Sequence, residues 1–231
     1  MTVVDKLHVT AGIEGFPDDD LVKVVVLDLR MIWLWIPKVA GSSISKALIG
    51  AYKERAIPCH IPLELIWRLN PEYRGFEVIG FKRNPYTRIV SCWFSKVISR
   101  NAVNASYFSK GRYAGLRHGM PFAEFAAWLN TPAGSDERAD QHWMSQHLLL
   151  QRADRTLPFE ELSTAVAGLG LGRLPHNNDR ARLAERTGVE HKPATAHYDA
   201  ASYADITRRF AKDLEVLGYD FPGEPPSAVG S

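Results

Sequence analysis

The sequence predicts an α/β fold in which a central parallel sheet is flanked by helices. Two nearly continuous apolar runs, residues 22–29 and 31–36, are typical of strands covered on both faces, and one of them is expected at the centre of the sheet. A second junction of strand and helix is indicated in residues 76–100. Hydrophobic residues make up 45% of the 231-residue chain, which is enough to bury a substantial core.

The first predicted helix follows the second apolar run after a short loop. Residues 42–55 place Ile44, Leu48 and Tyr52 four apart, on one helical face, with polar residues between them. The loop between strand and helix belongs to the stretch PKVAGSSI, which begins at Pro37. This part of the chain is therefore expected to form a strand, a tight loop and a helix.

The same order recurs in GFEVIGFKRNPYTRIVSCWFSKVISR. Residues 77–82 predict a short strand and residues 86–100 a helix. Pro85 suits the first position of that helix, because the N–H that proline lacks has no partner there. Polar and basic side chains again lie between strand and helix.

The remaining chain predicts mostly helices and loops. Residues 101–119 are polar and indicate a long or partly helical loop of the kind that covers a substrate. The simplest organisation is one domain over residues 1–231 with irregular ends at 1–20 and 223–231; two small domains are the alternative. The other expected elements are helices at 122–129, 141–151, 179–186 and 201–217, a turn at 131–137, and a short strand in RTLPFEEL followed by a helix that ends at Gly168.

Charge and cysteine content exclude several classes of protein. With 28 Lys and Arg against 26 Asp and Glu, the net charge of +2 argues against a nucleic-acid partner, so any anion site must be local. Cys59 and Cys92 have neither metal-ligand nor redox spacing and are expected to be packing residues of a reduced, cytoplasmic protein. No secretory signal and no apolar stretch of about 20 residues is present, so we expect no integral membrane contact.

The PKVAGSSI loop has the chemistry of an anion site. A loop before a helix presents backbone N–H groups and the positive end of the helix dipole. Lys38 adds a charge, Gly41 lets the backbone approach a ligand, and Ser42 and Ser43 add donors. Lys38 precedes the glycine, unlike the lysine of a Walker A motif, which disfavours ATP hydrolysis. An ordinary turn with an exposed lysine and a serine cap is the alternative.

A second anion site is indicated in FKRNPYTRIVS. Arg83 leaves the end of a strand and can grip a phosphate through its planar guanidinium. Ser91, two helical turns further on, can donate to the same group. Two such sites in one sheet suit a ligand with two separated phosphates.

The ordered pair of motifs, Pro-Lys-x-x-Gly-Ser-Ser-Ile and then Arg-x-Pro-x-x-Arg-x-x-Ser, resembles the phosphate-binding signatures of sulfotransferases that use 3′-phosphoadenosine 5′-phosphosulfate (PAPS). The branch of carbohydrate sulfotransferases is the most similar. PFEEL, LPHNN, DQHWMSQ and the helical segment ending in Gly-Tyr at residue 219 are also similar to family segments, so the resemblance extends over residues 32–219. Departures are Trp35, where the family commonly has histidine or another polar residue, and Asn84, where it often has aspartate.

The resemblance implies a P-loop-NTPase-like sheet and PAPS as the sulfuryl donor. Lys38 is expected near the bridging oxygen, and no metal is expected. The phosphosulfate end is assigned by similarity to Pro37, Lys38, Ala40, Gly41, Ser42 and Ser43, and the 3′-phosphate to Arg83 and Ser91.

An attacking hydroxyl must lose its proton to a base whose pKa lies near the working pH, which favours histidine. His60 follows the first helix where several related carbohydrate enzymes carry a catalytic histidine, and His142 lies in the DQHWMSQ segment. A structural role is the alternative for each. His118 and His176 are weaker candidates for ligand contacts.

The resemblance therefore predicts sulfuryl transfer to a hydroxyl of a carbohydrate or glycoconjugate. Two alternatives stay open: sulfation of another kind of small molecule, and a non-catalytic nucleotide-binding protein of the same fold. The sequence carries no signal of oligomeric state.

Overall fold

The structure is a computed structural model that describes residues 21–99, 108, 113–136, 140–171, 174 and 192–226. Contacts within the chain group it into two compact units. The first unit comprises residues 1–83 and 146–176, and the second comprises residues 84–145 and 177–231. The helix predicted at 179–186, most of the predicted 101–119 loop and His176 lie outside the described residues.

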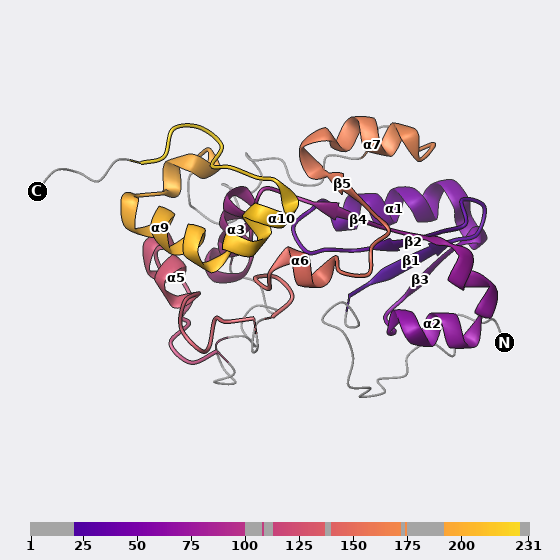
Figure 1. The fold of residues 1–231 in the computed structure, drawn as a ribbon, viewed down its shortest axis with the longest axis horizontal. Coiled ribbons are helices and arrows are strands. Elements are labelled where there is room, and N and C mark those ends of the chain that lie inside the picture. Colours follow the sequence, from indigo (N-terminus) through magenta and orange to yellow (C-terminus); the bar gives the residue numbers. More distant parts are fainter. Residues whose placement is uncertain are drawn as a thin grey trace, which may run out of the picture. The chain divides into compact units, whose positions relative to one another are not determined.

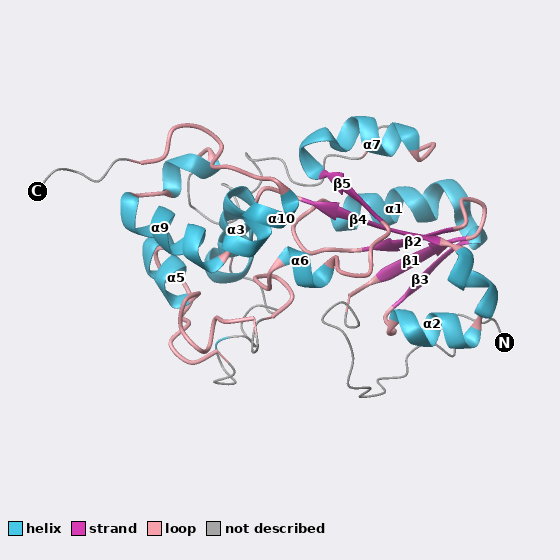
Figure 2. Ribbon diagram, viewed as in Figure 1, coloured by secondary structure: helices cyan, strands magenta, loops and turns pink. Residues whose placement is uncertain are grey.

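The first unit is built on a five-stranded sheet with the order β3-β1-β2-β4-β5 (Figure 2). β1 is antiparallel to both of its neighbours, whereas β2, β4 and β5 pair in parallel. The sheet is therefore mixed, because the central strand β2 has an antiparallel neighbour on one side and a parallel neighbour on the other. The predicted α/β class is confirmed, with two antiparallel pairings that the predicted parallel sheet did not include. The strands are β1 (Lys23–Val26), β2 (Met31–Leu34), β3 (Ala56–Cys59), β4 (Glu77–Lys82) and β5 (Arg155–Pro158).

The two apolar runs form a hairpin. β1 and β2 are buried along their whole length, and the register pairs Val26 with Met31 across a turn in which Arg30 has a φ of 47°. The run predicted at 22–29 is therefore shorter as a strand, because its last residues form this turn. β2 lies at the centre of the sheet, as predicted, and β4 has the predicted bounds.

Helices cover both faces of the sheet (Figure 1). α1 (Gly41–Tyr52) and α7 (Leu162–Gly168) lie over one face, and α2 (Leu63–Leu69) and α6 (Gln146–Leu149) lie over the other. Ile44 and Leu48 of α1 are buried, which confirms the predicted apolar face. On the opposite face, a Cβ at Gly80 would lie 2.3 Å from Cδ2 of Leu150, so glycine allows the segment after α6 to pack directly on β4.

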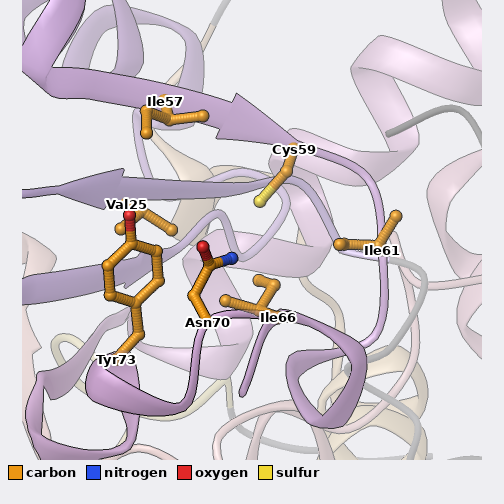
Figure 3. Close-up of a pocket in the computed structure, with 7 residues that line it drawn as sticks. All are labelled: Val25, Ile57, Cys59, Ile61, Ile66, Asn70 and Tyr73. Carbon is orange, nitrogen blue, oxygen red and sulfur yellow. The ribbon is translucent and has the colours of Figure 1, made fainter. Parts of the chain in front are cut away.

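A small cavity of about 30 Å³ lies between α2 and the strands β1 and β3 (Figure 3). Its walls are mainly apolar. Cys59 contributes its thiol, and burial raises the pKa of that thiol to about 11 although the Lys23 charge lowers it. A thiol with that pKa stays protonated at neutral pH, which supports a packing role. The lining residues are Val25, Ile57, Cys59, Ile61, Ile66, Asn70 and Tyr73.

The second unit is helical and has an aromatic core. α3 (Pro85–Trp93) continues into a π-helical turn, Phe94–Ile98, and α5 (Phe122–Trp128) packs with α9 (Ala200–Arg209). The Asn84 side chain caps α3 by accepting the Tyr86 N–H at 3.0 Å, and Pro85 takes the first helical position as predicted. The buried rings of the core are Tyr86, Trp93, Phe94, Tyr113, Phe122, Phe125, Trp128, Trp143, Tyr198 and Phe210.

Two helix predictions need correction. The helix expected at 141–151 is limited to Gln146–Leu149, because the N–H groups of Trp143 and Met144 bind the Asp140 carbonyl and close a separate turn. The helix expected at 201–217 is divided at the buried Phe210 into α9 and α10 (Ala211–Leu217). Within the residues that the structure describes, none of the helices has the length and apolar character needed to cross a bilayer.

Candidate functional site

The candidate site lies at one edge of the sheet in the first unit. β3, β2, β4 and β5 all run in the same direction, since β2 and β3 both pair antiparallel with β1. Their carboxyl ends therefore meet at the same edge, which is where open α/β sheets bind ligands. The segments that leave this edge contain His60, the loop of residues 37–40, Arg83 and Phe159.

The loop between β2 and α1 has an unusual backbone. Lys38 and Ala40 have φ values of 72° and 61°, in the left-handed region, and α1 begins directly afterwards at Gly41. The Ala40 carbonyl accepts the Ser43 N–H at 2.9 Å and the Ile44 N–H at 3.1 Å. Backbone turned in this way directs successive N–H groups toward one point, as anion-binding loops do. Lys38 is half-buried, Ser42 is exposed and Ser43 is buried.

Gly41 is required by the tryptophan that precedes the loop. A Cβ at residue 41 would lie 1.8 Å from Nε1 of Trp35, so any other side chain would displace the indole. Trp35 also stacks on Trp33, with ring centroids 6.1 Å apart. Trp35 therefore gives the start of α1 an apolar wall.

Arg83 connects the end of β4 to this loop. Its guanidinium donates from Nη1 to the Lys38 carbonyl at 2.8 Å. Its Cζ lies 4.5 Å from the centroid of the Phe159 ring, which is close enough for a cation–π interaction. The two cationic residues that the sequence predicts for the two ends of one nucleotide are thus neighbours in the structure.

Gln146 is a site residue that sequence reasoning missed. Its buried side chain accepts the Arg83 N–H at 3.0 Å and donates to the Arg83 carbonyl at 2.7 Å. The two residues are 63 positions apart. The DQHWMSQ segment contains this glutamine, but nothing in its spacing indicates that Arg83 is its partner.

His60 directly follows β3 and is exposed. Cys59 and Leu34 both pair with Lys23, on its two sides, which places the ends of β3 and β2 two strand spacings apart, about 10 Å. His60 and the Lys38 loop therefore emerge from the same edge of the same sheet.

The other residues predicted for the site belong to the second unit. Ser91 is half-buried on α3. Arg88, the second arginine of the motif, is fully buried and donates to the carbonyls of Met144 and Gln141, at 2.9 and 3.1 Å. Burial lowers the pKa of Arg88, and the nearby Cys92, Asp213 and Asp136 oppose that shift. Arg88 holds the turn at residues 140–144.

His142 lies in that turn. Its Nδ1 contacts Oδ1 of Asp140, which also accepts the His142 backbone N–H at 3.0 Å. Oδ2 of Asp140 accepts the Tyr113 hydroxyl at 3.1 Å, and the Cys92 thiol donates to the His142 carbonyl at 2.6 Å. A carboxylate at Nδ1 fixes the orientation of an imidazole and favours the proton on Nδ1.

A metal centre finds no support among the described residues, which contain no group of three or more His, Cys, Asp or Glu side chains able to hold an ion. The site in the first unit suits an anionic ligand instead. It combines two cations, a left-handed loop and the first turn of α1. The Trp35 indole fills the space beside Gly41, so the close approach of a ligand to the backbone that the sequence predicts at Gly41 is not seen in this structure.

The loop backbone can be tested by stability measurements. Ala40→Gly is expected to raise the free energy of unfolding by about 1 kcal/mol, because glycine adopts a φ of 61° without the steric cost of a Cβ. Ala47→Gly, in the middle of α1, is the matched control and should lower it by about 0.5–1 kcal/mol. Urea titration measures both. Equal losses in the two variants would contradict the left-handed backbone at Ala40.

Comparison with known proteins identifies the family of the chain. The model of the sulfotransferase family matches residues 24–220. Searches of the curated proteins and of the solved structures gave no match. The matched segment includes the Lys38 loop, Arg83 and Gln146, and it confirms the sulfotransferase resemblance, while the carbohydrate branch stays a prediction. The chain belongs to the sulfotransferase family, whose members transfer sulfuryl groups to acceptor molecules.

Proposed function

We propose that this protein is a PAPS-dependent sulfotransferase that sulfates an acceptor hydroxyl on a carbohydrate or glycoconjugate. The observation that supports the donor is the hydrogen bond of 2.8 Å between the Arg83 guanidinium and the Lys38 carbonyl. It joins, within the first unit, one cationic residue from each of the two predicted phosphate sites. A nucleotide with phosphates at both ends of its ribose can engage both grips.

Lys38 has the central chemical role in this proposal. PAPS, when bound, supplies an activated sulfuryl group whose departure leaves negative charge on a phosphate oxygen. A cation near that oxygen stabilises the transition state more than the ground state, which is the condition for raising kcat. The N–H groups at the start of α1 and the hydroxyls of Ser42 and Ser43 add donors to the same charge.

Arg83 grips the 3′-phosphate in this proposal. A guanidinium is planar and carries five N–H donors, and one N–H of Arg83 binds the Lys38 carbonyl. Phosphate accepts paired N–H groups from arginine in a planar arrangement. Ser91 is proposed as a second donor to the 3′-phosphate on the basis of the family resemblance.

His60 is the proposed base, because it leaves the same edge of the sheet as the Lys38 loop. His60→Ala is therefore expected to lower kcat by about 10²-fold or more, with nucleotide affinity little changed. His142→Ala, the second candidate, should lower kcat much less. Steady-state kinetics and calorimetry on both variants measure this, and the reverse ranking would assign the base to His142.

The donor is tested by isothermal titration calorimetry with adenosine 3′,5′-bisphosphate and with ATP. We expect the bisphosphate to bind at least tenfold more tightly than ATP. Tight binding of ATP without a response to the bisphosphate would overturn the proposal.

The acceptor is tested by transfer of label from PAPS to a panel of acceptors. A carbohydrate acceptor is supported by the resemblance of PKVAGSSI and of the His-Trp pair in DQHWMSQ to the carbohydrate branch. Transfer to oligosaccharides supports that branch, and transfer only to phenols or other small molecules replaces it. Bisphosphate binding with no transfer to any acceptor would favour a non-catalytic nucleotide-binding protein.

A further inference from the structure

Arg83 is held from three directions by residues of its own unit. Gln146 binds both its backbone N–H and its carbonyl, Phe159 lies beneath its guanidinium, and the Lys38 carbonyl accepts its Nη1. A long arginine side chain is normally mobile, so binding a ligand usually costs the conformational entropy that the side chain loses when it becomes ordered. Here contacts within the protein already order the Arg83 side chain, so less of this entropy is lost when a ligand binds.

We propose that Gln146 and Phe159 are positioning residues that aim Arg83 at the 3′-phosphate, so that the discrimination between a 3′,5′-bisphosphate nucleotide and a 5′-monophosphate nucleotide depends on them. This inference rests on the proposed function. Neither residue needs to touch the nucleotide, because both act through Arg83.

Gln146 acts on the backbone at the point where β4 ends. Its amide presents one acceptor and one donor to the N–H and carbonyl of a single residue, as a neighbouring strand does. Gln146 is fully buried, so removing its side chain would leave two polar backbone groups without these partners in a dry environment. The direction in which the Arg83 side chain leaves the sheet therefore depends on this amide.

Phe159 acts on the guanidinium. The register pairs Lys82 with Pro158, so the residues that follow them, Arg83 and Phe159, leave adjacent strands side by side. The ring lies 4.5 Å from Cζ of Arg83 and supports one face of the planar group. A planar guanidinium held by one face presents its N–H edge to a ligand, which suits paired binding of phosphate.

The test compares the affinities of adenosine 3′,5′-bisphosphate and adenosine 5′-monophosphate by calorimetry. The dissociation constant of the monophosphate divided by that of the bisphosphate measures the contribution of the 3′-phosphate to affinity. Gln146→Ala should reduce this ratio by about tenfold, as expected for the loss of a well-placed charge-assisted bond. Phe159→Leu should reduce this ratio by about threefold to fivefold. Phe159→Tyr, which keeps an aromatic ring, should have the ratio of the wild type. Affinity for the monophosphate should stay within twofold of the wild type.

Phe76→Leu is the matched control. The Phe76 ring also lies near an arginine, since its centroid is 5.1 Å from Cζ of Arg30. Phe76 directly precedes β4, at the end of that strand opposite to Arg83. Phe76→Leu should leave the ratio unchanged. Equal loss of affinity for both nucleotides in the Gln146 and Phe159 variants, or an unchanged ratio in both, would overturn the positioning role. A wild-type protein that binds the two nucleotides equally would instead overturn the proposed function. The Phe159→Leu and Phe159→Tyr pair decides the outcome if Gln146→Ala fails to fold.

Discussion

Lys38→Ala is expected to lower kcat by about 10²–10³-fold, with a much smaller change in affinity for the bisphosphate nucleotide. The proposed role of Lys38 is to stabilise charge that develops on the leaving phosphate oxygen, and an interaction that strengthens only in the transition state affects kcat rather than ground-state binding. The half-buried position of Lys38 strengthens the effect, because a charge is screened less away from bulk water. Steady-state sulfuryl transfer to any accepted hydroxyl, with calorimetry of nucleotide binding, measures both quantities.

Lys46→Ala is the matched control for this variant. Lys46 is an exposed lysine on α1, the helix that the Lys38 loop begins, and it should retain kcat within about twofold because the interactions of surface charges are weak. A Lys38→Ala variant that retained wild-type kcat would remove Lys38 from the chemistry.

Arg83→Ala is expected to weaken binding of adenosine 3′,5′-bisphosphate by about 2 kcal/mol or more, which is about 30-fold in the dissociation constant. The change removes the charged grip proposed for the 3′-phosphate. It also removes the donor that holds the Lys38 carbonyl, so a decrease in kcat should accompany the loss of affinity. Binding of adenosine 5′-monophosphate should weaken much less, since that nucleotide has no 3′-phosphate.

Arg155→Ala provides the comparison. Arg155 begins β5, which is paired with β4, and it forms an exposed ion pair with Glu77 at 2.7 Å. Its removal should leave the affinities for both nucleotides unchanged, because exposed ion pairs contribute little. An Arg83→Ala variant that bound the bisphosphate as tightly as the wild type would overturn the assignment of Arg83 to the 3′-phosphate.

Elements with a strong local pattern were predicted well. β4 was predicted with its observed bounds, the apolar face of α1 is buried, and α3 begins at the proline that the sequence marks. β3 was missed, because Ala56–Cys59 is short and contains a proline, which a strand accepts only at the edge of a sheet, where β3 lies. The helix expected over 141–151 was too long, because a turn closed on the Asp140 carbonyl occupies its first part.

The direction of β1 also had no local signal. Both apolar runs predict buried strands, and a buried strand has the same composition whichever way its neighbours run. The antiparallel placement of β1 has a functional consequence, because it makes β3 run in the same direction as β2. His60 thereby leaves the same edge of the sheet as Lys38.

The sequence alone determined the chemistry of the two strand-to-helix junctions: a lysine and a glycine in one, and an arginine in the other, each next to a helix start. Those features are local, and residue type and short spacing are enough to indicate them. Only the tertiary structure decided how they are held. Arg83 binds the Lys38 carbonyl, 45 residues away in the sequence, and Gln146 binds the Arg83 backbone from 63 residues away. The Trp35 indole lies against Gly41 because of its ring orientation. Such contacts depend on strand order, register and packing, which no local periodicity encodes.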